Sequence, residues 1–190
     1  MNRAFTPGER QKILESSDPD RMLWSLWAGK ETAYKAVRRR FPSVSSAPAR
    51  YEVHLPDEGS HGPESGTVDT PSGPVSVRFC ITSDYIHCLG AGTDKEVDAV
   101  LWEVRKIPRR YFLPDGDSAF VREIAKQHIA RYMRKQSEAV RIVRPKGCLG
   151  LAPPVVQIAG CTSAVTLSMS HDGRYAAFAF SVCPERGNRL

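Results

Sequence analysis

The chain has 190 residues, of which 41% are hydrophobic and 25% charged, a composition typical of a globular protein large enough to bury a substantial core. It contains no long uncharged apolar run, and residues 1–12 are polar and proline-containing, which argues against a membrane span and a signal peptide. The five cysteines form no Cys-x-x-Cys pair, which argues against a zinc site or disulfide framework and favours reduced thiols in a cytoplasmic protein.

The net charge of +6 calls for an anionic partner. Nucleic acid is the first class to consider for a basic domain. The chain carries no nucleic-acid-binding motif, however, and its basic and aromatic residues do not interleave along a strand. Nucleic acid therefore stays an alternative, supported by charge alone.

The first twenty residues contain two sequence patterns that are typical of helix N-termini. Thr6 precedes Pro7 and stands three positions before Glu9, a capping-box pattern that predicts a helix from Pro7. Asp18 followed by Pro19 predicts a second helix start. Good helix formers then continue to the basic run 38–40, whose positive charges suit a helix C-terminus.

The second of these helices carries an unusual polar stripe. Trp27, Glu31 and Lys35 are successive i, i+4 neighbours, so they lie on one face, and Lys30 stands beside Glu31. A carboxylate can hold Mg²⁺, which binds through one or two carboxylates together with substrate phosphates, while the lysines would meet the remaining phosphate charge. The simpler interpretation is a surface ion pair on an amphipathic helix.

The middle of the chain predicts a mixture of strands and helices. Alternating apolar residues predict strands, and a loop rich in glycine and proline is expected at 56–66. Apolar residues at helical spacing predict two helices, the second with His128 and Tyr132 on its buried side and a solvated basic face opposite. The predicted strands are Tyr51–Leu55, Pro74–Thr82, Tyr85–Leu89 and Ala139–Arg144, and the predicted helices are Glu96–Ile107 and Ser118–Arg134.

Near the end, Val165–Ser170 and Tyr175–Val182 are expected to form a hairpin turned by residues 171–174, since Asp-Gly is a strong hairpin signal. The turn alone does not explain why two serines and His171 precede it. A frayed tail is expected over residues 184–190.

Taken together, Trp-x-x-Lys-Glu-x-x-x-Lys at 27–35 and Ser-x-Ser-His at 168–171 followed by Tyr-Ala-Ala-Phe-Ala resemble the 4'-phosphopantetheinyl transferase superfamily, in particular its small, holo-acyl-carrier-protein-synthase-like branch. The resemblance covers roughly the first forty and last fifty residues, while residues 51–144 carry no family motif. It implies an α+β fold in which an antiparallel sheet packs against a long helix. The expected organisation is one such domain over 1–190, with a division into two small lobes left open.

The resemblance also implies a reaction: the phosphopantetheine arm of coenzyme A moves to a serine of an acyl or peptidyl carrier protein with Mg²⁺, as in fatty acid or polyketide biosynthesis. Carried over residue by residue, Glu31 is the magnesium ligand and Lys35 assists transfer, both as catalytic groups. Lys30, Ser170, His171 and Asp172 are expected to bind substrate, with Asp172 orienting His171 or accepting a proton. The basic run 38–40 would contact the acidic carrier. The expected protein is cytoplasmic, independent of membranes, and a monomer or homo-oligomer.

One family feature is absent from the sequence. Members of the family have a Gly-x-Asp strand ahead of the Phe-Thr-Pro-x-Glu segment, and its aspartate is a second metal ligand. Here Phe5 stands almost at the first residue, and no Gly-x-Asp occurs in a convincing context. Three explanations stay open: a shortened start, a metal site built differently, or a non-catalytic relative that still binds coenzyme A or a carrier protein.

Overall fold

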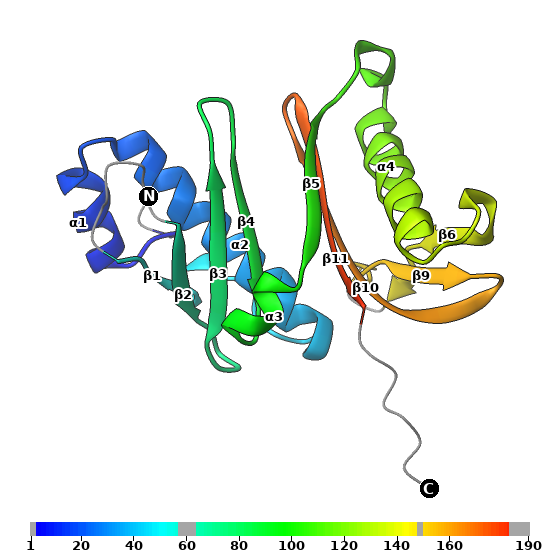
Figure 1. Cartoon of the computed structure of the whole chain (residues 1–190). Helices are drawn as coiled ribbons and strands as arrows, with labels where there is room; N and C mark the ends of the chain where they lie inside the picture. The colour runs from blue at the N-terminus through cyan, green and yellow to red at the C-terminus, as the bar shows by residue number, and fades with distance from the viewer. Residues whose placement is uncertain (1–2, 57–63, 148–149, 183–190) are drawn as a thin grey trace, which may run out of the picture. The chain divides into compact units, whose positions relative to one another are not determined.

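The computed structural model describes residues 3–56, 64–147 and 150–182. The chain divides into two compact units, Met1–Ala99 and Val100–Leu190. The boundary falls inside the segment 51–144 that carries no family motif. Most elements of both units are labelled in Figure 1, and each unit is treated by itself below.

Unit 1 begins with the two predicted helices, α1 (Pro7–Glu15) and α2 (Pro19–Arg40). The capping box of α1 is complete: Glu9 N donates to Thr6 Oγ1 at 3.3 Å, and Thr6 N donates to Glu9 Oε2 at 2.8 Å. Asp18 caps α2 by accepting from Arg21 N at 3.0 Å. Both sequence-predicted helix starts are confirmed.

The rest of unit 1 is an antiparallel sheet in the order β1-β2-β3-β4, with short helical turns at Pro48–Arg50 and α3 (Asp94–Asp98). Its strands are β1 (Glu52–His54), β2 (Ser65–Asp69), β3 (Val75–Ile81) and β4 (Ile86–Ala91). Three of these strands, β1, β3 and β4, were predicted. Strand β2 was not, because the Ser-Gly pair at its start is typical of a loop. Residues 57–63 of the predicted loop lie outside the described residues.

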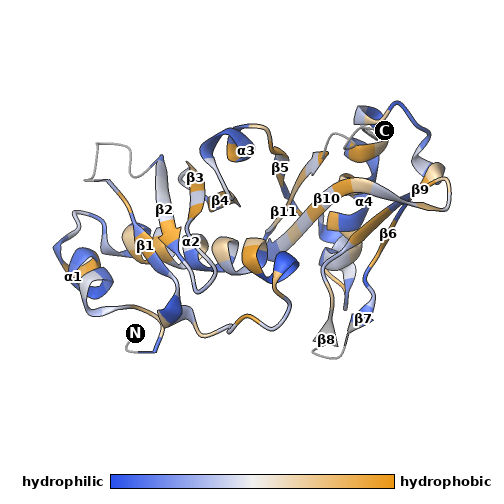
Figure 2. Cartoon of the chain, turned by 90° about the horizontal axis from the view of Figure 1, so that it is seen from below, coloured by the Kyte–Doolittle hydropathy of each residue, from blue (hydrophilic) through white to orange (hydrophobic). Residues whose placement is uncertain are grey.

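The core of unit 1 lies between α2 and this sheet. Leu26, Ala33 and Val37 of α2 are buried in one apolar cluster with Val53 and Val77 of the sheet. Hydrophilic and hydrophobic residues alternate along α2 in Figure 2, as expected of a helix with one face in a core.

Unit 2 is built on a five-stranded antiparallel sheet in the order β5-β11-β10-β9-β6. A helix, α4 (Gly116–Tyr132), packs its apolar side chains Phe120, Ile124 and Ile129 into one cluster with Leu167 and Phe178 of the sheet. The strands are β5 (Leu101–Lys106), β6 (Val140–Val143), β9 (Val155–Ile158), β10 (Cys161–Asp172) and β11 (Tyr175–Val182). Short helical turns lie at Arg109–Tyr111 and Ser137–Ala139, and β7 (Lys146–Gly147) pairs with β8 (Gly150–Leu151).

Two helix predictions in this region need correction. Residues 101–106 are not helical: they form β5, and Leu101 to Lys106 pair antiparallel with Phe180 to Tyr175 of β11. Pairing with β11 satisfies the backbone hydrogen-bonding groups along the whole segment. The segment is therefore a strand although its apolar residues have helical spacing. In α4, Tyr132 was expected to be buried but is 54% exposed.

The C-terminal hairpin is longer than predicted. His171 pairs with Ala176 and Asp172 with Tyr175, so both belong to the strand ladder rather than to the turn. Gly173 takes a φ of 53° at the turn, a left-handed conformation that glycine adopts without strain. The predicted tail lies outside the described residues from 183 onward.

All the strand pairs described are antiparallel, and helices accompany both larger sheets. The mixed α and β class with antiparallel sheets is therefore confirmed. Among the described residues, no helix is both long and apolar enough to cross a membrane.

Candidate functional site

Lys30, predicted to contact phosphate, lies inside unit 1. Its side chain is 2% exposed, and Nζ lies 2.7 Å from Glu9 Oε2, itself 2% exposed. Nζ also donates to the carbonyl oxygens of Pro48, at 3.2 Å, and Tyr51. The geometry gives Lys30 a structural role, because its donors face protein oxygens rather than solvent.

Glu9 completes this buried network. Its Oε1 accepts from Val53 N at 2.9 Å, and its Oε2 accepts from Thr6 N. The Glu9 side chain therefore completes the α1 capping box and also binds the backbone of β1 and the ammonium of Lys30. Buried charges are tolerated when they are paired and hydrogen-bonded, as both are here.

Glu31 and Lys35 are placed differently. Glu31 is half-buried and Lys35 is exposed, one turn further along α2. Within the described residues, the Glu31 carboxylate has no hydrogen-bond or ion-pair partner. A carboxylate and an ammonium at i, i+4 on an accessible face can together meet a ligand that carries both phosphate and a hard cation.

Contacts with β4 fix the rotational position of α2 about its own axis. Thr32 Oγ1 donates to the carbonyl oxygen of Cys88 at 3.1 Å. A Cβ added at Gly90 would stand 2.7 Å from Thr32 Cγ2, so helix and strand approach closely there. Since Thr32 follows Glu31 directly, this contact sets the direction in which Glu31 is presented.

His87 and Cys88 of β4 are held in their uncharged forms. Burial, assisted by the positive charge of Lys35, lowers the pKa of His87 from 6.5 to about 4. Burial raises the pKa of the Cys88 thiol to about 12. At neutral pH neither side chain adds charge beside the Glu31–Lys35 face.

In unit 2, His171 has a partner that the sequence did not indicate. His171 Nδ1 lies 2.8 Å from Asp117 Oδ2, in the first turn of α4, and the two side chains are 41% and 42% exposed. The expected partner was Asp172, the next residue in the chain. Its position excludes that role, because consecutive strand residues point to opposite sheet faces.

The Ser-x-Ser-His residues consequently divide between the two faces of the sheet. His171 is opposite Ala176, which is buried in the cluster with α4, so His171 belongs to the helix-covered face. Ser170 and Asp172, opposite Ala177 and Tyr175, belong to the other face.

The basic run 38–40 ends α2, as predicted. The guanidinium of Arg38 lies 5.7 Å from the centre of the Tyr34 ring, and that of Arg40 lies 5.7 Å from the Phe41 ring. Burial lowers the pKa of Arg39. The three arginines are thus partly engaged with unit 1 rather than uniformly directed to solvent.

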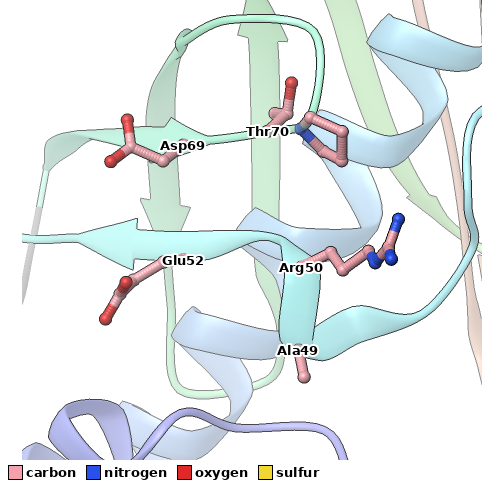
Figure 3. Close-up of a pocket in the computed structure, with 6 residues that line it drawn as sticks. Ala49, Arg50, Glu52, Asp69 and Thr70 are labelled. Atoms are coloured by element: carbon pink, nitrogen blue, oxygen red, sulfur yellow. The ribbon is translucent and has the colours of Figure 1, made fainter.

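One shallow pocket of about 370 Å³ lies in unit 1, away from the predicted residues. Figure 3 shows the Glu52 and Asp69 carboxylates directed to one side and Arg50 to the other. Asp69 is paired with His54 Nε2 at 3.0 Å, and Glu52 accepts from Thr6 Oγ1 at 3.0 Å. The polar groups are directed apart or already paired, so the pocket has no convergent set with which to hold a ligand.

The described ranges contain no cluster of three or more His, Cys, Asp or Glu side chains that could hold a metal ion. Glu31 therefore belongs to no such cluster among the residues that the structure describes. Magnesium bound chiefly through substrate phosphates and water requires no more than one or two protein carboxylates, so Glu31 fits that mode of binding.

Comparison with known proteins relates the N-terminal part of the chain to one family. Residues 1–89, which span α1, α2 and the sheet into β4, match the family model of the 4'-phosphopantetheinyl transferase superfamily. The match confirms the resemblance to this superfamily for residues 1–89, which include the motif at 27–35. No curated protein and no solved structure matches the chain.

The match ends at residue 89, short of unit 2. The Glu31–Lys35 stripe lies inside the matched region, whereas the Ser-x-Ser-His segment lies outside it. The roles given to Ser170, His171 and Asp172 accordingly stay predictions.

Proposed function

We propose that the chain transfers the 4'-phosphopantetheine group of coenzyme A to a serine hydroxyl of an acyl or peptidyl carrier protein. The observation that carries this proposal is the superfamily match over residues 1–89, within which Glu31 and Lys35 stand accessible on one face of α2. In the reaction, the serine oxygen forms a new bond to the phosphorus of the phosphopantetheine group, the phosphorus–oxygen bond of the pyrophosphate breaks, adenosine 3',5'-diphosphate leaves, and the serine proton passes to water.

The proposed roles follow from charge and position. The Lys35 ammonium neutralises charge that develops on the phosphate, which is the main requirement in phosphoryl-type transfer. Glu31 would be the protein ligand of Mg²⁺, which supplies further neutralisation of the pyrophosphate when it is bound. Lys30 is left out of the proposed site because its ammonium is buried and paired with Glu9.

The net charge of +6 supports the proposed partners, since coenzyme A carries several phosphates and carrier proteins are acidic. His171 is proposed as a contact to the coenzyme's phosphates, whereas Ser170, on the opposite sheet face, is left out of that contact. Asp172 is proposed only as an acidic residue at the surface that does not contact His171, because it lies on the opposite face of the sheet.

The test is transfer of a fluorescent coenzyme A analogue to a panel of purified apo-carrier proteins, with Mg²⁺ or with EDTA. We expect Mg²⁺-dependent labelling that Glu31→Ala abolishes. Glu123→Ala is the matched control, because Glu123 lies on another helix, α4, where its Oε1 accepts from Gln127 Nε2 at 2.7 Å. Labelling by Glu31→Ala at the unaltered rate would overturn the mechanism.

A non-catalytic relative is the second candidate, favoured because the described residues hold no cluster of three or more side chains that could bind a metal ion. It predicts coenzyme A binding by calorimetry without labelling of any carrier. Absence of both binding and labelling would overturn both candidates.

A further inference from the structure

Among the described residues, three histidines form ion pairs with carboxylates, and they do so in two different ways. His54 and His128 approach Asp69 and Glu103 through Nε2, the outer ring nitrogen. His171 approaches Asp117 through Nδ1, the nitrogen nearest the backbone. His128 Nδ1 also lies 3.0 Å from the carbonyl oxygen of Ile124, so both of its ring nitrogens are engaged. The His171 ring is held at Nδ1 and leaves its outer nitrogen available.

The Asp117 carboxylate is itself fixed. Its Oδ1 accepts from the backbone N–H of Ser118 at 2.6 Å, so one oxygen is bound to the α4 backbone while the other meets His171. An acidic residue is also favourable in the first turn of a helix, which holds this carboxylate in place. The position of the first turn of α4 therefore determines the orientation of the His171 ring.

The protonation pattern of the ring follows from the contact. An ionised carboxylate only accepts hydrogen bonds, so Nδ1 must carry the proton that faces Asp117. Within the part of the chain that the structure describes, Nε2 has no hydrogen-bond partner, and the side chain is 41% exposed. Nε2 is free to accept from a ligand when the ring is neutral and to donate to one when it is protonated.

We propose that Asp117 is a positioning residue that fixes the His171 ring with Nδ1–H toward α4 and Nε2 toward a phosphate group of coenzyme A. The choice of ligand rests on the proposed function, whereas the orientation of the ring does not. Asp117 acts only through His171 and touches no substrate itself.

The orientation is tested by long-range ¹H–¹⁵N spectra of the full chain labelled with ¹⁵N-histidine, at a pH where the ring is neutral, with His171 assigned by His171→Asn. We expect the Nδ1-protonated tautomer in the unaltered chain and in Asp117→Asn, whose amide oxygen still accepts. Asp117→Ala should convert His171 to the Nε2-protonated tautomer. Glu103→Ala, the matched control, should leave the His171 tautomer unchanged. An Nε2-protonated ring in the unaltered chain, or an unchanged tautomer in Asp117→Ala, would overturn the proposal.

The ligand is tested by calorimetry with coenzyme A. Asp117→Ala should weaken binding about tenfold, the scale of one hydrogen bond to a charged group, and Asp117→Asn should recover most of the loss. Adding Asp117→Ala to His171→Ala should weaken binding no further, since both changes act through one ring. Full-strength binding by Asp117→Ala would overturn the substrate half of the proposal. Failure of the chain to label any carrier would leave the tautomer result standing and would count only against the proposed transfer.

Discussion

Glu9 and Lys30 form a buried ion pair of 2.7 Å in which each side chain is only 2% exposed. Glu9 belongs to the Phe-Thr-Pro-x-Glu segment and Lys30 to the Lys-Glu helix, so the two N-terminal motif segments are joined physically. The ammonium of Lys30 also lies 5.6 Å from the centre of the Phe5 ring. These contacts explain why a lysine stands beside Glu31 without reaching the same surface.

Replacement of Lys30 should therefore act on stability. Lys30→Met removes the cation and leaves the Glu9 carboxylate buried without its ion-pair partner, which should cost about 3–5 kcal/mol in the free energy of unfolding. The measurement is urea denaturation followed by tryptophan fluorescence. A Trp102→Phe background confines the signal to Trp24 and Trp27, both in unit 1.

The matched variant is Glu9→Gln combined with Lys30→Met, in which no unpaired buried charge remains. It should lose distinctly less stability than Lys30→Met alone. Equal losses in the two variants would show that the ion pair is not what stabilises the junction of α1 with α2.

The close approach of α2 to β4 gives a second prediction. Gly90→Ala places a methyl group 2.7 Å from Thr32 Cγ2, which a β-branched side chain on a helix cannot readily avoid. The variant should be less stable by about 1–3 kcal/mol. Gly8→Ala is the control, because its added methyl group meets nothing within 4 Å and lies in α1, where alanine is the better helix former. A Gly90→Ala variant as stable as the unaltered protein in urea denaturation would contradict the prediction.

Local sequence signals predicted the parts of the fold that local interactions determine. The caps at Thr6 and Asp18 depend on residues three positions away, and the structure has both helices where the caps predicted them. Strand β5 was predicted as a helix because its apolar spacing is ambiguous and its pairing partner, β11, lies more than sixty residues further along the chain.

The candidate site residues show the same difference between local and long-range interactions. Glu31 and Lys35 follow from i, i+4 spacing on one helix, and helix geometry alone places them on one face. The burial of Lys30 depends on Glu9, Pro48 and Tyr51, which the helix pattern does not include. The pairing of His171 with Asp117 joins the end of β10 to the start of α4, and no short-range pattern connects them.

Lys35→Ala is expected to separate activity from stability, in contrast to Lys30→Met. Lys35 is exposed, so its loss should change the free energy of unfolding by less than about 0.5 kcal/mol. If the proposed transfer holds, kcat should fall about 10²-fold, the effect of losing one preorganised charge donor. Lys95→Ala, an exposed lysine of the same unit, is the control for both assays. Unaltered labelling by Lys35→Ala would remove Lys35 from the site.

His87 should make stability depend on pH. Its pKa is about 4 in the folded protein, against 6.5 for an ordinary histidine, because the ring is buried and faces the charge of Lys35. Above pH 6.5 the ring is neutral in both states and contributes nothing. Between pH 6.5 and 4 the unfolded chain binds the proton and the folded chain does not, so stability falls as the pH falls, by about 3 kcal/mol over the whole interval.

Urea denaturation at several pH values between 4 and 7, in the Trp102→Phe background, measures this slope. His87→Gln should flatten it, since glutamine does not titrate. His54→Gln is the control: the His54 side chain is 50% exposed in the same unit, and its loss should leave the slope from His87 in place. A slope that persists unchanged in His87→Gln would show that another group of unit 1 binds the proton on unfolding.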